Sequence, residues 1–202
     1  MATYGGAVTQ IISELGRSIT SITAIVEQEV LSAVDYYAST RFWFNEARAT
    51  FTTSSGQSTY TGTTGILEID SLVITISGAK YELRPENYAV LNALDLGTVN
   101  GQPTTYAYWQ EAIRLYPVPN ASFTVAIEYQ QRFATLSLST ESNAFLTHGL
   151  DMIKARVQKN VSALRFKDRE QAQACAMLEN NAFERLIMQT ERLTSTGRLS
   201  PG

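Results

Sequence analysis

The chain has 202 residues, which is enough to bury a substantial hydrophobic core as one domain or as a domain with a large insertion. No stretch of eighteen or more apolar residues is present, so we expect no transmembrane span and no membrane partner. The N-terminus lacks the basic and then apolar build of a signal peptide, which predicts synthesis in a cytoplasm.

Charge is distributed unevenly along the chain, although the net charge is only −3. From Asp151 to the C-terminus there are nine basic and six acidic residues, whereas the first 150 residues contain seven basic and thirteen acidic ones. The two parts therefore carry +3 and −6. Solvated helix faces account for most such asymmetry, although it could also orient subunits or complement a partner. An excess of three positive charges does not predict nucleic-acid binding.

Two amphipathic helices are predicted at the start of the chain. The first covers residues 7–15, whose apolar side chains share one face, and Gly16 ends it. The second begins at a cap formed by Ser18 or Thr20 and continues to about Arg48. Its apolar face comprises Ile22, Ile25, Val26, Val30, Ala33, Val34 and Tyr37.

Three consecutive aromatic residues, Phe42, Trp43 and Phe44, lie near the end of the second predicted helix. No single helix face can hold all three, so at least one must contact a neighbouring layer. We interpret them as the joint between two layers. The plainer alternative, that they fill the end of a helical bundle, is compatible with this interpretation.

From Ala49 onward the period of the apolar residues changes from 3.6 to 2, which predicts strands. Gly78 predicts a tight hairpin between two of them, and Pro85 ends the strand that follows. The predicted strands are rich in β-branched and aromatic residues and cover residues 50–53, 66–70, 72–76 and 80–83.

A short helix and three further strands complete the middle of the chain. The helix is predicted over residues 86–94, where Tyr88, Leu91 and Leu94 share a face. The strands are predicted to form an antiparallel meander with one buried and one wet face, and they cover residues 105–110, 112–116 and 123–131.

Residues 142–194 predict two long amphipathic helices separated by residues 165–167. Asp168, followed three residues later by Gln171, predicts an N-cap with a capping box. The apolar stripes at three- or four-residue steps are Leu146, Leu150, Ile153, Val157, Val161 and Leu164 in the first helix, and Cys175, Leu178, Ala182, Leu186, Thr190 and Leu193 in the second. Cys175 is the only cysteine, so a disulfide within the chain is excluded, and we interpret it as a small apolar side chain of the stripe.

These elements predict an α+β fold. Long helices are unstable without partners, so the N-terminal and C-terminal helices, residues 1–48 and 140–194, are expected to form a helical bundle. Residues 49–139 are expected to form an inserted antiparallel β-sheet or sandwich domain. Residues 195–202 have no apolar periodicity and are expected to form a flexible C-terminal tail.

The sequence contains few groups suited to catalysis. His148 is the only histidine, and neither a Gly-x-Ser-x-Gly elbow nor a nearby cysteine accompanies it, so we interpret it as a packing or helix-start residue. A hydrolase that uses His148 remains a third hypothesis. Residues 62–65, Gly-Thr-Thr-Gly, lack the Gly-Lys-Ser/Thr ending of a phosphate-binding loop.

Two acidic pairs, Glu27 with Glu29 and Glu68 with Asp70, contain the residue type that binds hard cations. Neither pair lies in the Gly-containing loop of a calcium site. We therefore expect no metal, no cofactor and no enzymatic activity.

Aromatic residues of the predicted strands could stack on sugars or bases. Few basic residues lie among them, which disfavours a nucleic-acid platform, and such residues more often form sheet core and cross-strand pairs. The residues concerned are Tyr60, Tyr81, Tyr106, Tyr108, Trp109 and Tyr116.

The order of these features resembles the head-to-tail adaptor proteins of tailed bacteriophages, over about residues 22–193. The resemblance is carried by an ordered set of segments, followed by a strand that ends near Tyr129 and by two helices. The segments are Arg41–Glu46, Tyr81–Pro85, Gly101–Tyr106 and Ile113–Pro119.

The resemblance implies a structural protein of the virion neck, made in the host cytoplasm. Such proteins form a ring, usually of twelve copies, beneath the portal protein and join it to a tail nozzle or stopper protein. Genomic DNA would pass through the channel of the ring without specific binding.

In that family the C-terminal helix and tail commonly dock on the portal, so Arg192, Arg198 and Leu199 are the candidates for portal contact. The strands would meet neighbouring subunits and tail proteins, with Trp43, Tyr106 and Trp109 as the candidate contacts. The main alternative is a carbohydrate- or protein-binding tail module that uses the aromatic β face.

Overall fold

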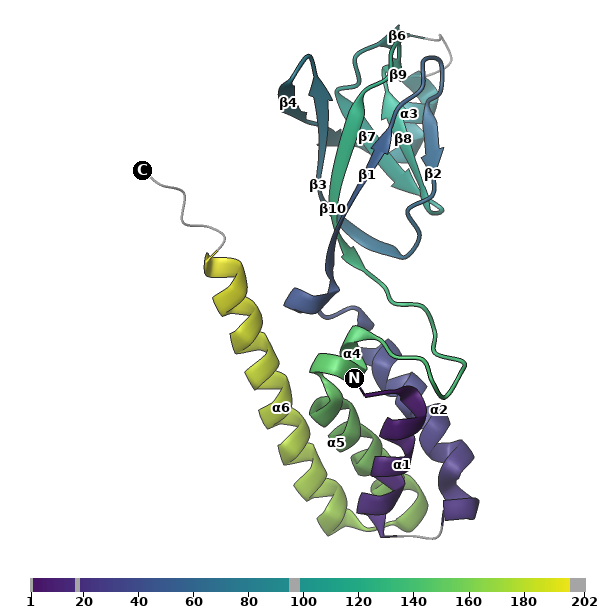
Figure 1. Ribbon diagram of the computed structural model, residues 1–202, viewed down its shortest axis with the longest axis vertical. Coiled ribbons are helices and arrows are strands. Elements are labelled where there is room, and N and C mark those ends of the chain that lie inside the picture. The colour runs from purple at the N-terminus through teal and green to yellow at the C-terminus, as the bar shows by residue number, and fades with distance from the viewer. Residues whose placement is uncertain (1, 17–18, 95–98, 197–202) are drawn as a thin grey trace. The chain divides into compact units, whose positions relative to one another are not determined.

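The computed structural model describes residues 2–16, 19–94 and 99–196. The chain divides into two compact units (Figure 1). Met1–Asn45 and Phe133–Gly202 form one, the helical unit, and Glu46–Arg132 form the other, the β unit. The β unit is therefore inserted between two helical segments, and the predicted α+β fold with an inserted sheet is confirmed.

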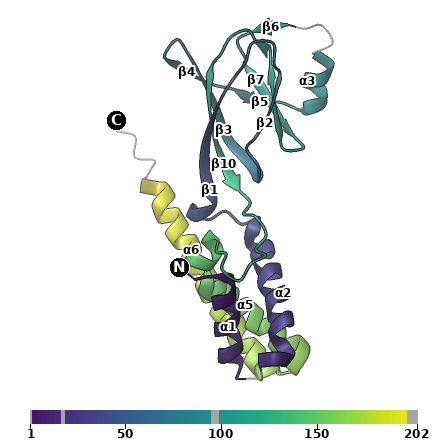
Figure 2. The same ribbon diagram turned by 45° about the vertical axis from the view of Figure 1, so that its right-hand side comes forward.

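The helical unit contains the N-terminal and C-terminal helices. In chain order its elements are α1 (Tyr4–Leu15), α2 (Ile19–Ala38), the 3₁₀ turn η1 (Trp43–Asn45), α4 (Ala144–His148), α5 (Leu150–Val161), the π-helical turn η2 (Ser162–Phe166) and α6 (Arg169–Thr196). Helix α5 packs against α1, α2 and α6, so it is the central helix of the unit (Figures 1 and 2).

Local hydrogen bonds explain where two of the helices begin or end. Gly16 adopts a left-handed conformation with φ of 63° and donates its N–H to the carbonyl of Ser13, which confirms the predicted end of α1. Asp168 accepts a hydrogen bond of 3.0 Å from the backbone N–H of Gln171, which confirms the predicted N-cap of α6.

The prediction that the second helix continues to about Arg48 is wrong, because α2 ends at Ala38. The side chain of Asn45 stabilises a turn at this point. Its Oδ1 accepts a hydrogen bond of 2.8 Å from the N–H of Phe42, and its Nδ2 donates one of 2.9 Å to the carbonyl of Thr40. Because Asn45 is fully buried, these bonds satisfy polar atoms that water cannot reach.

The prediction of one unbroken helix from Leu146 to Leu164 is also wrong. The chain bends at Gly149, which separates α4 from α5 and donates its N–H to the carbonyl of Phe145 at 2.8 Å. A Cβ atom at Gly149 would lie only 3.1 Å from that oxygen, so glycine permits this close approach.

The core of the helical unit is built from the apolar faces of its helices and from Phe42 and Phe145. Cys175, Ala182, Leu186 and Thr190 are buried, as the stripe of α6 predicts. Three other members of the predicted stripes are exposed instead: Leu164, Leu178 and Leu193.

The β unit contains two four-stranded sheets and a two-stranded one within the described residues. The first has the antiparallel order β1-β10-β3-β4, formed by Glu46–Thr52, Thr124–Gln131, Ile66–Ile76 and Ala79–Glu82. The second has the order β2-β8-β7-β5, formed by Thr59–Thr61, Ala112–Tyr116, Thr105–Trp109 and Arg84–Pro85. Strands β6 (Asn100–Gly101) and β9 (Val118–Pro119) form the third, and α3 covers Tyr88–Leu94.

Side chains from both four-stranded sheets form one core, as in a β-sandwich. Leu72, Ile74 and Ile127 come from the first sheet, whereas Ile113 and Leu115 come from the second. The predicted hairpin at Gly78 is confirmed, because β3 and β4 pair on either side of Ser77–Gly78.

The predicted three-stranded meander is wrong, because its last strand belongs to the other sheet. Strands β7 and β8 do pair, but β10 lies between β1 and β3. Val125, Ile127 and Tyr129 therefore reach the shared core from the opposite side to Ile113 and Leu115. The residues predicted as two strands, 66–70 and 72–76, are one strand with two register shifts against β10.

Candidate interaction surfaces

Helix α6 has a buried face and a second, partly apolar face that is exposed. Its 28 residues would extend about 42 Å at 1.5 Å per residue. Met177 is 66% exposed and Met188 is 55% exposed. Eleven residues are close to three full helical turns, so these two methionines lie on the same side of α6. Large apolar side chains on that side suit a protein contact rather than the core of the unit.

The three portal-contact candidates fall at or beyond the end of α6. Arg192 lies in the last turns of the helix, and its side chain is exposed. Arg198 and Leu199 lie outside the described residues.

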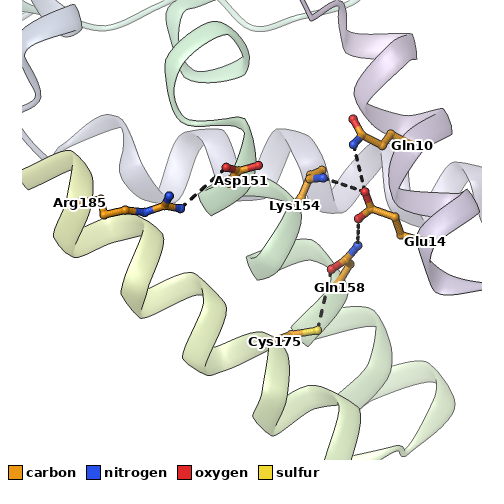
Figure 3. Close-up of polar contacts among 7 residues, drawn as sticks. All are labelled: Gln10, Glu14, Asp151, Lys154, Gln158, Cys175 and Arg185. Atoms are coloured by element: carbon orange, nitrogen blue, oxygen red, sulfur yellow. Dashed lines mark hydrogen bonds and ion pairs between the residues drawn. The ribbon is translucent and has the colours of Figure 1, made fainter.

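Polar side chains join the central helix α5 to its neighbours (Figure 3). Glu14 on α1 accepts a hydrogen bond of 2.7 Å from the ammonium of Lys154 and one of 2.5 Å from the amide of Gln158. Burial would raise the pKa of Glu14, but the hydrogen bonds and positive charge of Lys154 and the bond from Gln158 outweigh it, so the pKa is lowered. Cys175 on α6 lies 3.9 Å from the Oε1 of Gln158, and burial raises the pKa of its thiol.

A second network surrounds Glu179, which is only 6% exposed. Its carboxylate accepts hydrogen bonds from Tyr37 Oη at 2.6 Å, from Arg156 at 2.9 Å and from Lys159. The guanidinium of Arg156 also lies 3.3 Å from the centre of the Tyr36 ring. These contacts connect α2, α5 and α6 around one buried carboxylate.

The pKa values of this network follow from its geometry. Burial would raise the pKa of Glu179, but hydrogen bonds from Lys159, Tyr37 and Arg156 outweigh it, so the pKa is lowered. The pKa of Tyr37 is strongly raised, first by burial and then by its bond to the carboxylate. At neutral pH the network therefore contains the carboxylate of Glu179, the guanidinium of Arg156 and the neutral phenol of Tyr37.

Trp43, Phe44 and His148 form an aromatic cluster in the helical unit. The His148 ring lies 5.6 Å from Phe44, nearly parallel to it, and 5.5 Å from Trp43. The backbone N–H of Trp43 donates to Thr190 Oγ1 at 3.3 Å, which ties η1 to α6. The cluster fits the packing role expected for His148.

His148 also lines a groove of about 530 Å³, together with Glu141, Ser142 and Thr147. The other three side chains are bound to the backbone. Glu141 accepts from the N–H groups of Ser137 and Leu138, Ser142 donates to the carbonyl of Ala2, and Thr147 donates to the carbonyl of Asn143. An acid, a base and a hydroxyl are thus near one another without the mutual hydrogen bonds of a catalytic triad.

Two of the candidates for subunit or tail contact, Tyr106 and Trp109, lie in the β unit, and one is buried while the other is exposed. Tyr106 is 5% exposed and belongs to the sandwich core, so its ring offers no surface for a partner. Trp109 is 55% exposed at the end of β7. Its indole stacks on Tyr88 with ring centres 6.2 Å apart. The guanidinium of Arg114 lies 5.5 Å from the centre of the Tyr88 ring and donates a hydrogen bond to Asn92 Oδ1.

The described residues contain no group of three or more His, Cys, Asp or Glu side chains that could hold a metal ion. None of the described helices is both long enough and apolar enough to cross a lipid bilayer.

The fold defines an α+β protein with a sheet domain inserted into a helical one, and large apolar side chains are exposed on both units. The sequence profile of the family described as SU10 adaptor protein matches residues 2–202. The chain therefore belongs to the SU10 adaptor protein family, and it is a bacteriophage structural adaptor of the virion that assembles with other head and tail proteins. No curated protein matches the chain.

Sequence reasoning missed the Glu179 network. Leu178 belongs to the stripe that was predicted to be apolar and buried, but it is exposed. The next residue, Glu179, faces the core instead. The sequence does contain a sign of this. Glu179 is four positions after Cys175 and three before Ala182, so it lies on the same helix face as these two buried residues.

Proposed function

We propose that this adaptor forms a ring, of about twelve copies as the family resemblance implies, that joins the portal protein to a tail nozzle or stopper protein. The ring would continue the channel for genomic DNA, and the protein would have no enzymatic role. The observation that carries the proposal is the family match over residues 2–202, combined with the exposed apolar face of α6.

The C-terminal end of α6 supports contact with the portal. Arg192 is exposed near the C-terminal end of α6, and ten residues follow it in the sequence. Deleting residues 194–202 is expected to abolish binding to purified portal protein without changing the free energy of unfolding, because the described core residues of the helical unit end at Ile187. Arg165→Ala, at an exposed residue of η2, is the matched control and should bind normally. Normal binding by the truncated protein would count against this docking mode.

The Met177 and Met188 side of α6 supports contact between copies. Replacing both methionines by aspartate would introduce charge into a buried contact without altering the core of the free chain. The double variant is expected to bind portal protein as a monomer, whereas the native chain forms a complete ring on it, as native mass spectrometry would record. Gln189→Asp, at an exposed residue of α6 about 100° around the helix from Met188, is a one-charge control. A complete ring from the double variant would contradict the assignment.

The channel proposal predicts little attraction for DNA. The first 150 residues carry −6, which suits a surface along which DNA slides without being held. Assembled rings mixed with linear duplex DNA should show no measurable binding even at low salt. Tight binding that weakens steeply as salt is added would contradict this expectation, because that behaviour reports phosphate contacts.

Trp109 favours one second candidate, a carbohydrate- or protein-binding module on the β unit. Its exposed indole is held in place by Tyr88, although Tyr60 and Tyr106 of the expected aromatic face are buried. Binding on a glycan array that disappears in Trp109→Ala but persists in Tyr81→Ala would support this function. Absence of any glycan binding would leave Trp109 as a candidate contact for tail proteins.

A further inference from the structure

The β unit contains a cavity that none of the contacts proposed above uses. Its volume is about 260 Å³, and it is lined by residues of β1, β2 and β8 and by the turn before β8. Cavities that hold whole drug-sized ligands are usually about 300–1,000 Å³. This one is therefore suited to a single side chain or to a group of similar size.

Two aromatic rings and an aliphatic side chain form its apolar wall. The rings of Phe51 and Tyr60 lie 5.1 Å apart, and Ile113 is buried beside them. The Tyr60 hydroxyl donates to the carbonyl of Gln57 at 2.6 Å and accepts from the N–H of Ser54 at 3.1 Å. These bonds fix the ring, so the wall is formed before any ligand enters.

Glu111, which is exposed, is the one charged residue among the described residues that line the cavity. Within the described part of the chain, its carboxylate forms no ion pair. A carboxylate at an aromatic wall, without a cation of its own, favours a positively charged ligand.

The backbone at Glu111 is itself unusual. Gln110 and Glu111 have φ values of 48° and 59°, a left-handed conformation that Asn-Gly adopts far more easily in a two-residue hairpin. Asn-Gly would fit this two-residue turn with less strain, so the fold alone does not require a carboxylate at this position.

The rim of the cavity adds hydroxyl acceptors. Thr50, Thr61 and Thr63 line it together with Glu111. A guanidinium presents up to five N–H donors in a plane, which can bond a carboxylate and neighbouring hydroxyls together and lie flat against an aromatic ring. An ammonium has only three donors and is more strongly hydrated.

We propose that this cavity binds a guanidinium group, supplied as an arginine side chain by a neighbouring protein of the assembly. Glu111 would pair with the guanidinium, while the partly buried Phe51 ring would contact its face and the buried Tyr60 ring would support Phe51 from behind. The protein source of the arginine rests on the proposed function, whereas the preference for a guanidinium does not.

The test uses the full-length chain and small probes followed by NMR. N-acetyl-arginine methylamide is expected to shift the amide signals of Thr61, Thr63 and Glu111 saturably, and the neutral isostere N-acetyl-citrulline methylamide is not. Glu111→Gln should weaken arginine binding at least about tenfold. Glu68→Gln, at an exposed carboxylate of β3, is the matched control and should bind as the native chain does.

Equal shifts from arginine and citrulline, no saturable shift with arginine, or unchanged binding in Glu111→Gln would each overturn the site. N-acetyl-lysine methylamide should bind more weakly than the arginine probe, and equal or tighter binding would overturn the preference for a guanidinium. The free diamine 1,4-diaminobutane tests whether the cation comes from a protein side chain. Tighter binding of the free diamine than of the arginine probe would overturn the assignment to a protein side chain. The portal and ring experiments alter only the helical unit, so their failure would be independent of this result.

Discussion

Tyr37 and Glu179 lie 142 positions apart in the sequence, yet Tyr37 Oη donates a hydrogen bond of 2.6 Å to Glu179 Oε1 in the interior of the helical unit. The same carboxylate binds Arg156 and Lys159 of α5. One buried side chain therefore fixes α6 against both α2 and α5. Because α6 also carries the face proposed to contact other subunits, this network sets how that face is presented.

Glu179→Gln is expected to destabilise the helical unit by about 2–3 kcal/mol. The change preserves the shape of the side chain but leaves Arg156 and Lys159 without their carboxylate, and such a loss is severe where the charges are largely buried. Urea unfolding measures the effect. Glu184→Gln, at an exposed carboxylate of the same helix, should change the free energy of unfolding by less than about 0.5 kcal/mol.

The lowered pKa of Glu179 predicts a dependence of stability on acid pH. A carboxyl group whose pKa is lower in the folded than in the unfolded chain contributes stability above its unfolded pKa, about 4.3 for Glu. That contribution is lost as pH falls from this value through the lower folded pKa. The difference in free energy of unfolding between native protein and Glu179→Gln should therefore shrink over that interval. A difference that stays constant down to pH 2 would contradict the pKa assignment.

The helices and strands of this fold can be predicted from the sequence because the spacing of apolar residues depends only on neighbouring positions in the chain. Gly16 and Asp168 also mark helix ends by local backbone geometry and capping. The partner of β10 is not local. Alternation at Val125 and Ile127 predicts a strand with one buried face, but it contains no information on whether β8 or β3 lies beside it.

The surfaces were less predictable than the fold, for a related reason. Trp109 and Tyr106 both belong to β7 and were equal candidates, yet Trp109 is exposed and Tyr106 faces the sandwich core. Which face of a strand is buried depends on the second sheet, whose position the sequence does not specify. The cavity beside Glu111 likewise requires β1, β2 and β8 to be brought together, so no single motif marks it.

Removal of two buried hydroxyl groups, those of Ser162 and Thr190, should change the free energy of unfolding in opposite directions. Ser162 is fully buried and its Oγ has no hydrogen-bond partner among the residues that the structure describes, so Ser162→Ala should stabilise the protein by about 0.5–1 kcal/mol. Thr190 donates to the carbonyl of Leu186 at 2.8 Å and accepts from the N–H of Trp43. Thr190→Val keeps its shape and should destabilise by about 1 kcal/mol. Thermal unfolding measures both, and destabilisation by Ser162→Ala would indicate a partner for its hydroxyl.

Gln110→Gly should raise the free energy of unfolding by about 0.5–1 kcal/mol, because glycine adopts the left-handed conformation at this position without strain. Gln102→Gly is the control: Gln102 is also exposed but has no positive φ, so the greater freedom of glycine in the unfolded chain should destabilise the protein slightly. Urea unfolding of the two variants should give changes of opposite sign. Equal changes would mean that the turn at Gln110 is not strained.

Among the β-unit glycines that the structure describes, Gly65 is the one where an added methyl group should destabilise the fold most. Its φ is 74°, and a Cβ atom would lie 2.6 Å from the carbonyl oxygen of Arg132, whose N–H binds the Gly65 carbonyl. Gly65→Ala therefore combines backbone strain with a clash against backbone, and we expect a loss of about 3 kcal/mol or more.

Gly62→Ala separates the two causes. Gly62 also has a positive φ, of 132°, but a Cβ atom there would have no described atom of another residue within 4 Å. Only the conformational penalty of about 1–2 kcal/mol should remain. Hydrogen exchange of the β-unit amides would locate the loss, which for Gly65→Ala should extend to β3 and β10, the strands that begin and end beside the contact. Equal losses in the two variants would mean that the chain at Arg132 moves aside, and the close approach would then not be a constraint on the fold.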